Sequence, residues 1–501
     1  RLICGTVNVL NHRKKAVDLE NKTLLQAFEW YLPEDQQHWK RCAAMAESWA
    51  ALGISGVWLP PAYKGTGGKS DVGYGVYDTY DLGEFDQKGT VATKYGTRAE
   101  YLEAVAALHR AGIEVMADIV LNHRLGADAQ EEVLAVQDAG DNRNQTVADP
   151  RTIQAWTKFT FPGRKGKYSD FTWNWSHFDG TDWDSDWKYS GIFRFVGKQW
   201  DQETDSENGN YDYLMGADLD LSNPEVIAEL DRWGQWYYDT VKMDGFRLDA
   251  VKHMDFQFYT HWLGELRQNT GQTLPAVGEY WSWELDKLRH YLDVCGHCMR
   301  LFDVPLHYQF VKAATSNAQF DMAQILSNTL VQTEPDAAVT FVDNHDTQPS
   351  QALASWVPAW FKPLAYALIL LRKEGIPCVF YGDLVGIPHD RIAPVMGLER
   401  MIRARRDYAY GLQRDYFDDA NIIGWTLSGD DQHPHSGLAV IMSDAPGGTK
   451  TMELGAALAG KTMRDVLMNQ TEIIQLDENG CGTFPVGGGS VSVWALDEAY
   501  D

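Results

Sequence analysis

The stretch that decides the fold is Asp244-Gly245-Phe246-Arg247-Leu248-Asp249-Ala250-Val251-Lys252-His253. Apolar and charged residues alternate in it, and this period of two predicts a strand with Arg247 and Asp249 on one face. Buried charges are costly unless they are paired. Two interpretations therefore remain for the stretch alone. It is either a structural Arg–Asp pair that closes a strand, or an ionised carboxylate at the C-terminal end of a barrel strand, where catalytic groups gather.

Short apolar segments alternate with helical segments on both sides of this stretch. Strands are predicted at 24–30, 54–59, 113–121, 245–248, 274–278, 301–304, 339–342 and 378–381. Helical spacing is found at 35–52, 97–110, 224–240, 256–268 and 360–374. Continuous apolar strands between helices indicate a parallel sheet that is covered on both faces. Eight of them predict an α/β fold, the (β/α)8 TIM barrel.

Two regions break this rhythm. Residues 122–224 are rich in Gly, Asp and Trp and are too long for a structureless loop, so we expect a small inserted β-rich domain after strand three. Short strands at 422–427, 437–442, 483–486 and 490–495 lie between Gly-rich turns and predict an all-β sandwich. The expected organisation is an N-terminal extension (1–22), a barrel (23–121 and 225–410), an inserted domain (122–224) and a C-terminal β-sandwich (411–501).

The composition excludes some classes of partner. The chain has 501 residues, 70 acidic against 44 basic, for a net charge of −26. No basic surface is implied, which argues against nucleic acid and suits cations and a neutral substrate. The longest apolar run, at 364–371, is far too short to cross a membrane. We therefore expect neither nucleic acid nor a membrane as a partner.

The cysteines form no evident metal site. They are Cys4, Cys42, Cys295, Cys298, Cys378 and Cys481. Cys295-Gly-His-Cys298 is an isolated CxxC motif without a second pair at zinc-binding spacing, so we interpret the two residues as free thiols.

Charged residues recur where the predicted strands end. Asn122-His123 follow strand three, Arg247 and Asp249 belong to strand four, Glu279-Tyr280-Trp281 follow strand five, and Asp343-Asn344-His345-Asp346 follow strand seven. At this face of a barrel such residues indicate catalysis. Three carboxylates with two histidines and one arginine fit glycoside hydrolysis, which needs two carboxyl groups of different pKa.

These four segments resemble, in order and content, the signature regions of the α-amylase family of glycoside hydrolases (family 13). The resemblance extends over about residues 24–495. Finer matches, such as Phe28-Glu-Trp-Tyr and Asp71-Val-Gly-Tyr-Gly, are similar to the bacterial liquefying-type α-amylases and their intracellular relatives. The resemblance implies endo-acting, retaining hydrolysis of α-1,4-glucosidic bonds in starch, glycogen and related α-glucans through a covalent glycosyl-enzyme intermediate.

The resemblance also implies residue roles. Asp249 would be the nucleophile, Glu279 the general acid and then base, and Asp346 would stabilise the transition state. Arg247 would keep Asp249 ionised, and the apolar neighbours of Glu279 would raise the pKa of that carboxyl group. The residues expected to contact the substrate are Arg247, His123, His345, Tyr74, Lys252, His253 and Trp281.

Metal ligands are expected in the insert, where acidic residues crowd between 170 and 220. They are either a solvated acidic surface or buried ligands for a hard cation. The resemblance implies that Asn122, Asp212, Asp218 and the backbone carbonyl of His253 bind Ca²⁺, and that Asp179, Asp201 and Asp220 extend this site to a calcium–sodium–calcium cluster. Ser222 replaces a family Asp, which would weaken or remove the second Ca²⁺. Asp444, beside Asn421, is a candidate for a third site.

Alternatives remain open at this stage. Within the family, the chain could be a maltooligosaccharide-forming amylase or a transglycosylase. A non-catalytic glucan-binding scaffold is disfavoured, because all three carboxylates are present. We expect a monomer. Few cysteines and the similarity to intracellular relatives favour the cytoplasm slightly, whereas a starch substrate and the absence of an initial Met favour secretion.

Overall fold

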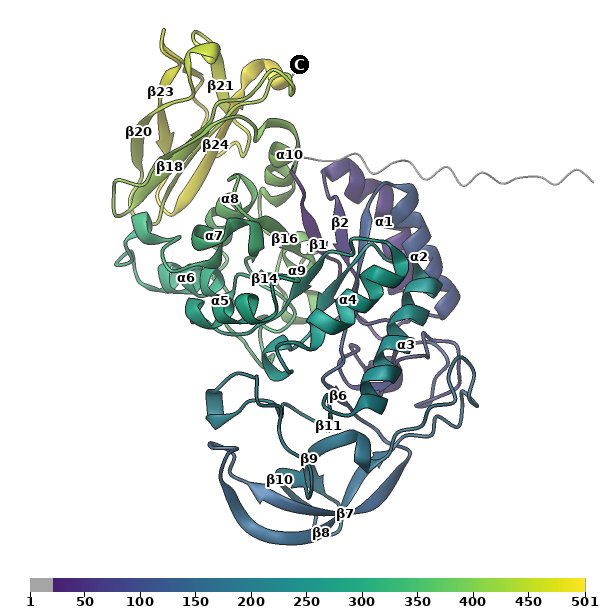
Figure 1. Cartoon of the computed structure of the whole chain (residues 1–501). Helices are drawn as coiled ribbons and strands as arrows, with labels where there is room; N and C mark the ends of the chain where they lie inside the picture. Colours follow the sequence, from purple (N-terminus) through teal and green to yellow (C-terminus); the bar gives the residue numbers. More distant parts are fainter. Residues whose placement is uncertain (1–20, 501) are drawn as a thin grey trace, which may run out of the picture.

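A closed parallel barrel of eight strands forms the centre of the molecule (Figure 1). The structure, a computed structural model, describes residues 21–500. The barrel strands are β1 (Leu24–Gln26), β2 (Gly56–Trp58), β5 (Glu114–Ile119), β12 (Gly245–Leu248), β13 (Ala276–Gly278), β14 (Arg300–Phe302), β15 (Ala338–Phe341) and β16 (Ile376–Phe380). All eight predicted strands are confirmed, and the barrel closes between β1 and β16. The extension expected at 1–22 falls almost wholly outside the described residues.

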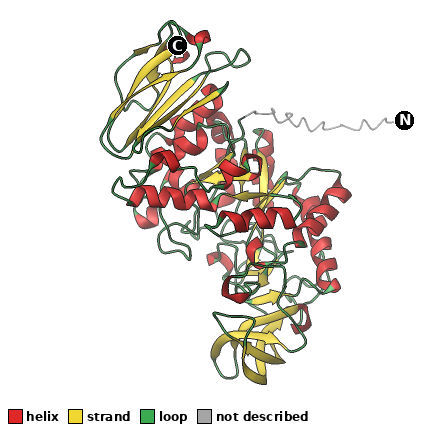
Figure 2. Cartoon of the chain, turned by 60° about the vertical axis from the view of Figure 1, so that its left-hand side comes forward, coloured by secondary structure: helices red, strands yellow, loops and turns green. Residues whose placement is uncertain are grey.

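Helices surround the barrel (Figure 2). They are α1 (His38–Leu52), α2 (Arg98–Arg110), α3 (Pro224–Val241), α4 (Phe258–Thr270), α5 (Leu285–Val294), α6 (Val304–Thr315), α7 (Leu330–Thr333), α8 (Lys362–Leu370), α9 (Tyr381–Val385) and α10 (Leu398–Tyr408). Local sequence fixes several helix starts. At α2 the Thr97 hydroxyl accepts a hydrogen bond from the Glu100 N–H, and the Glu100 carboxylate accepts one from the Thr97 N–H.

The insert after β5 is a six-stranded sheet, as expected from the sequence. Its strands are β6 (His123–Arg124), β7 (Ala129–Asp138), β8 (Thr146–Lys158), β9 (Phe178–Asp184), β10 (Tyr189–Phe195) and β11 (Ala217–Leu219), in the order β6-β11-β9-β10-β7-β8. The insert lies at the opposite end of the barrel from the C-terminal sheets (Figure 1). Strands β6 and β11 are the part of the insert nearest the barrel.

Three of the tryptophans of the insert lie outside its core. Trp173 is buried, but Trp175, Trp183 and Trp187 are 36%, 37% and 67% exposed. Trp187 lies in the β9–β10 turn, outside the sheet, and its ring packs on the guanidinium of Arg151 at 4.3 Å. Phenylalanines, among them Phe178, fill the core of the insert instead.

Two packed sheets form the C-terminal unit and confirm the predicted sandwich. Its strands are β17 (Gln413–Tyr416), β18 (Ile422–Leu427), β19 (Leu438–Ser443), β20 (Gly448–Glu453), β21 (Thr462–Asp465), β22 (Ile474–Gln475), β23 (Cys481–Val486) and β24 (Ser490–Leu496). The main sheet has the order β17-β18-β19-β24-β21-β22, and β20 pairs with β23. Met452, Phe484 and Trp494 are buried together. Among residues 21–500, no helix is long and apolar enough to cross a membrane.

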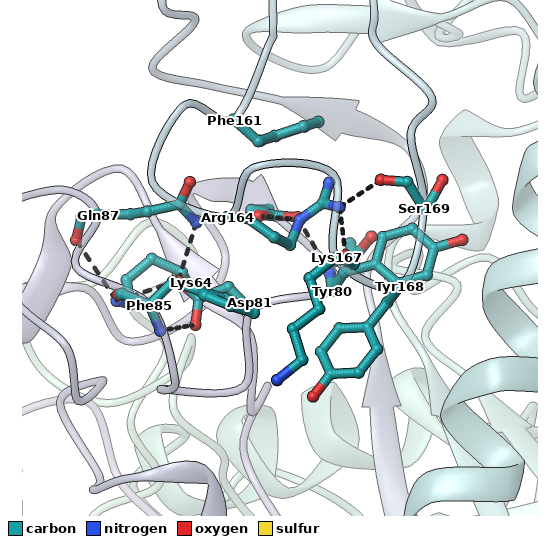
Figure 3. A network of polar contacts seen from close by, with 12 residues as sticks. Lys64, Tyr80, Asp81, Phe85, Gln87, Phe161, Arg164, Lys167, Tyr168 and Ser169 are labelled. Atoms are coloured by element: carbon teal, nitrogen blue, oxygen red, sulfur yellow. Dashed lines mark hydrogen bonds and ion pairs between the residues drawn. The ribbon is translucent and has the colours of Figure 1, made fainter.

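A buried polar network anchors the long segment between β4 (Val76–Asp78) and α2 (Figure 3). Lys64, in β3 (Lys64–Gly65), is fully buried. Its ammonium donates hydrogen bonds to the carbonyls of Phe85, Thr90 and Val91 at 2.9, 2.7 and 2.8 Å, and lies 3.2 Å from the Asp81 carboxylate. The lysine therefore acts as a fixed cation around which a loop without regular structure folds.

A second buried cation extends this network into the insert. The Arg164 guanidinium lies 2.8 Å from the Asp78 carboxylate and donates to the carbonyls of Lys167 and Ser169 at 2.8 and 2.6 Å. Figure 3 shows Lys64 and Arg164 side by side in the same network. The insert is thereby attached to the barrel through charges that are out of water.

Replacing Lys64 tests the importance of this fixed cation. Lys64→Met would remove the cation that is paired with Asp81 and one donor to each of the three carbonyls. Breaking a buried pair typically costs about 3–5 kcal/mol. We expect a clearly lower denaturant midpoint and Tm, measured by circular dichroism. Lys40→Met is the matched control, because Lys40 is 61% exposed in its pair with Glu100 and should contribute about 0–1 kcal/mol. Equal stability of the two variants would contradict the expectation.

Candidate active site

One arginine joins the carboxylates at the C-terminal face of the barrel. The Arg247 side chain, from β12, is fully buried. Its Nη1 lies 2.6 Å from Asp249 Oδ1 and 3.1 Å from Asp118 Oδ1, and its Nη2 lies 3.2 Å from Glu279 Oε2. A single guanidinium therefore holds three carboxyl groups that come from three neighbouring strands.

Strand register explains why these groups meet. Arg247 is opposite Asp118 of β5 and opposite Val277 of β13, so Glu279 follows directly after the paired part of β13. Ala250 adopts a left-handed conformation (φ 52°) just after Asp249, and its N–H donates to Glu279 Oε2 at 3.1 Å. This turn aims a backbone donor at the Glu279 carboxyl group.

Asp346 reaches the site from the loop after β15. His345 precedes it, with Nε2 3.4 Å from Asp346 Oδ2, and the Nδ1 of His345 is 3.0 Å from the amide of Gln26. The Tyr74 ring stacks on His345 at 5.0 Å and 9°, and its hydroxyl donates to Asp118 at 2.7 Å. Aromatic faces and carboxylates thus line the same space, an arrangement suited to a sugar ring.

Burial separates the protonation behaviour of these groups. It raises the pKa of Glu279 to about 8, with nearby Asp249 and Asp346 adding to the rise and Arg247 opposing it. Burial also raises the pKa of Asp346 to about 7 and that of Asp118 to about 6. It lowers the pKa of His345 well below its ordinary value, so this imidazole is neutral. Glu279 is therefore protonated at neutral pH, as a general acid must be.

The other predicted substrate contacts border the same face. His123 Nε2 contacts the carbonyl of Tyr74 at 2.8 Å. The Lys252 ammonium is bound to the Glu207 carboxylate at 2.5 Å and to the carbonyl of Trp281 at 3.1 Å. Lys252 is 7% exposed, so its ammonium is not a solvated surface charge.

His253 and Trp281 also have partners at this face. His253 Nδ1 contacts the carbonyl of Tyr211 at 2.8 Å, a link from the barrel to the insert. The Trp281 indole N–H donates to the hydroxyl of Tyr308 at 3.2 Å. Both residues therefore lie with Lys252 along the edge where insert and barrel meet.

Sequence reasoning missed some of the residues that support the site. The indole N–H of Trp58 donates to Asp118 Oδ2 at 3.0 Å, and its ring faces the Arg247 guanidinium at 4.8 Å. Gln26 orients His345, and Glu207 neutralises Lys252. Trp58 and Gln26 end β2 and β1. Their position at strand C-termini was the available signal.

Acidic residues of the insert form a buried cluster near the barrel. Ligand oxygens of Asp179, Asp212 and Asp218 all lie within 4.8 Å of one another, and each residue is at most 2% exposed. Among residues 21–500, no donor reaches either oxygen of Asp179 or of Asp218. Burial and mutual repulsion raise the pKa of both groups well above the ordinary value. Such a set of unsatisfied oxygens fits a hard cation.

Four other expected ligands of the insert site lie around this cluster. The N–H of Asp201 donates to Asp212 at 2.8 Å. The Asn122 backbone carbonyl accepts from Leu219 of β11 at 3.1 Å, and His253 contacts the insert through Tyr211 as described. Asp220 differs, because its carboxylate is already bound by Lys198 and by the Ser222 hydroxyl at 2.6 Å. A cation at Asp220 would have to compete with the Lys198 ammonium.

Asp444 lies far along the chain from these ligands, in the C-terminal unit. It accepts a hydrogen bond from Asn421 at 2.9 Å, and the Asn421 amide also reaches the carbonyl of Ala318 at 3.4 Å. The second oxygen of Asp444 is buried without a donor among the described residues. The pair sits where the C-terminal unit touches the barrel.

Comparison with known proteins agrees with this geometry. The model of the alpha amylase catalytic domain matches residues 49–421. The chain belongs to the α-amylase family. It is 54% identical to an alpha-amylase of Geobacillus stearothermophilus over 96% of this chain and 88% of the relative. It is 51% identical to a glucan 1,4-alpha-maltohexaosidase of Bacillus sp. strain 707 over 95% and 92%. A solved Anoxybacillus alpha-amylase shares the fold (TM-score 0.62, 17% identity, 95% and 98% covered).

The raised pKa of Glu279 predicts a pH-dependent cost to stability. Below pH 4.5, its ordinary value, both folded and unfolded states carry the proton. Between pH 4.5 and about 8 the folded state keeps the proton on Glu279 whereas the unfolded state loses it. The free energy of unfolding therefore falls as the pH rises through this range. Glu279→Gln should therefore gain stability over the native chain progressively from about pH 5 to about pH 8.

Urea unfolding at several pH values measures this difference. Glu284→Gln is a suitable control, because it removes a carboxylate that is 45% exposed and belongs to the same loop. A stability difference between Glu279→Gln and the native chain that does not change with pH would contradict the assignment of a raised pKa.

Proposed function

We propose that this chain is an endo-acting α-amylase that hydrolyses α-1,4-glucosidic bonds in starch, glycogen and related α-glucans with retention of configuration. The observation that carries the proposal is the single Arg247 guanidinium, which holds Asp249 and Glu279 at the ends of adjacent strands. Membership of the α-amylase family and near full-length identity to an alpha-amylase support it.

In the first step Glu279 acts as the acid and Asp249 as the nucleophile. Burial keeps Glu279 protonated at neutral pH, so it can donate its proton to the glycosidic oxygen as that bond breaks. Asp249, ion-paired with Arg247, attacks the anomeric carbon and forms a glycosyl ester. The departing glucan leaves with the proton of Glu279.

In the second step the roles reverse. Glu279 is now a carboxylate, accepts a proton from water and directs the hydroxide to the anomeric carbon, which releases Asp249 and restores the original configuration. Arg247 and the Ala250 N–H both face Glu279 and support its ionised form at this stage. The two displacements together return the enzyme to its starting state.

Asp346, His345 and Tyr74 bind the sugar ring whose glycosidic bond is cleaved. Asp346 lies beside neutral His345, and Tyr74 stacks on that imidazole. A carboxylate at this position stabilises positive charge that develops on the sugar in the transition state. His123, Lys252, His253 and Trp281 complete the proposed substrate contacts.

We further propose that the acidic cluster binds Ca²⁺ through Asp179, Asp212 and Asp218, with Asn122 and the His253 carbonyl. The cation would supply no chemistry. It would neutralise carboxylates that are otherwise buried without donors and would fix the insert beside the active site. Asp201, Asp220 and a Na⁺ ion would extend this site, and Asp444 would belong to a separate one. The Lys198 ammonium already neutralises Asp220, which favours a smaller cluster.

A second candidate function differs in product. The 51% identity to a maltohexaosidase favours a maltooligosaccharide-forming specificity as the alternative, and a transglycosylase would use the same glycosyl ester. Chromatography of the products from soluble starch separates the three. Mixed short and long fragments at early times support endo-hydrolysis, one dominant oligomer supports the alternative, and chains longer than the supplied maltooligosaccharide support transfer.

Glu279→Gln tests the chemistry. A neutral amide cannot donate the proton, so kcat on soluble starch should fall by about 10²–10⁴-fold, while circular dichroism stays unchanged. Glu284→Gln, the matched control, should keep native activity. NMR of the first product formed by the native enzyme should show the α-anomer. Undiminished turnover in Glu279→Gln, or a β-anomer, would disprove this mechanism. Glucan binding by the native chain without any turnover would indicate a scaffold.

Chelation tests the cation site. A ligand that binds only the folded state stabilises it by about 2.7 kcal/mol at a hundred times its Kd. EDTA should therefore lower the Tm of the native protein, and added Ca²⁺ should restore it. Asp218→Asn should have a lower Tm than the native protein and lose most of this response. Asp186→Asn, which alters an exposed acid of the same insert, should keep it. A Tm that does not respond to either reagent would argue against calcium.

A further inference from the structure

The isolated CxxC motif lies at the opposite end of the barrel from the active site. Cys295 follows α5 and is fully buried, and Cys298 is partly exposed just before β14 begins at Arg300. The starts of parallel strands form the face opposite to the one that carries Asp249 and Glu279. This pair is therefore unused by the mechanism above.

The backbone reverses between Cys295 and Cys298 and brings the two residues close together. Gly296 and His297 both have left-handed backbone conformations (φ 65° and 52°), so the chain reverses between the cysteines. The turn is fixed by the His297 N–H, which donates to the Leu292 carbonyl at 2.8 Å. The Cys295 thiol donates to the Leu292 carbonyl at 3.5 Å. The interaction between the two thiols lowers the pKa of Cys298 and raises that of Cys295.

Neighbouring side chains hold both ends of this turn. The Thr260 hydroxyl donates to the Cys295 carbonyl at 2.9 Å, and the Arg267 guanidinium donates to the Cys298 carbonyl at 2.9 Å. Arg267 also lies close enough to favour a negative charge on Cys298. The partly exposed Cys298 is thus the better nucleophile, and the buried Cys295 is the second thiol of the pair.

Two arginines lie beside Cys298 in a surface cavity. Cys298 lines a surface cavity of about 600 Å³ together with Arg267, His297 and Arg300. Arg267 and Arg300 donate hydrogen bonds to backbone carbonyls. Neither forms an ion pair with a carboxylate in the described chain. Glu334 and Asp336 are the acids of the cavity, and Glu334 is paired with Arg289.

We propose that Cys295 and Cys298 are a redox-active dithiol that exchanges with anionic low-molecular-weight disulfides. The Cys298 thiolate attacks one sulfur of the small disulfide, forms a mixed disulfide and releases one small thiolate. Cys295 then loses its proton, attacks the Cys298 sulfur and releases the second small thiolate. One small disulfide is reduced to two thiols while the protein dithiol is oxidised to a Cys295–Cys298 disulfide, so two electrons are transferred.

Oxidised glutathione is the probe for this site. The fully reduced native chain should lose the mass of two hydrogens and release two glutathione molecules, and peptide mapping should find Cys295 linked to Cys298. Cys295→Ser should stop at one glutathione on Cys298, and Cys298→Ser should form no adduct in this turn. Starch hydrolysis should be the same before and after oxidation, which checks that every variant is folded.

The arginines of the cavity allow a second, independent test. Arg300→Gln should slow the reaction with oxidised glutathione several-fold, but leave the rate with neutral hydroxyethyl disulfide unchanged. Cys481, partly exposed and without a neighbouring thiol among the described residues, is the internal control for general thiol reactivity. Three results would each overturn the proposal. They are a reaction at Cys481 as fast as at Cys298, as much glutathione adduct in Cys298→Ser as in Cys295→Ser, and a rate with oxidised glutathione that Arg300→Gln does not change. Protection of both thiols by one equivalent of Zn²⁺ would identify a metal site instead.

Discussion

The active site depends on keeping one guanidinium charge out of water. Arg247 is fully buried, a position that is tolerable only because Asp118, Asp249 and Glu279 surround it. The arrangement has one positive charge among three carboxyl groups, so full ionisation of all three would leave net negative charge in a low-dielectric space. The protein resolves this imbalance by raising the pKa of Glu279 and of Asp118. The protonated state of the proposed acid, Glu279, is thus mainly a consequence of its burial, with Asp249 and Asp346 adding to the rise in pKa and Arg247 opposing it.

The barrel could be predicted because its signals are local and redundant. Each strand is a short apolar run, and helices such as α2 begin with an explicit cap, Thr97. Several predicted strands, such as 24–30 and 54–59, are longer than the observed β1 and β2, since apolar residues continue into the loops that cover the barrel. In the C-terminal unit, β17 and β20 were missed because polar residues such as Arg414 and Lys450 occupy them. Their strand structure comes from pairing with neighbours distant in sequence, which a local pattern does not contain.

The site itself was only partly readable from sequence. The carboxylates and histidines stand at strand ends, where their chemical type is informative, and Asp249 with Arg247 was visible as a charged pair within a strand. Contacts made across the barrel were not visible: Gln26 reaches His345, and Trp58 reaches Asp118. The acidic density of the insert was evident, but not which carboxylates are buried together. Packing decided that Asp179 and Asp218 remain without donors and that Lys198 binds Asp220.

The Lys64 ammonium differs from a bound metal ion in that it cannot leave the protein. A bound ion at the Asp179–Asp218 cluster would exchange with the medium, whereas the Lys64 ammonium is covalently part of the chain and cannot be dialysed away. The segment around Asp81 therefore keeps its organising charge during synthesis, dilution or ion shortage, before any metal is present. The anchor of this segment consequently does not depend on the concentration of any ion.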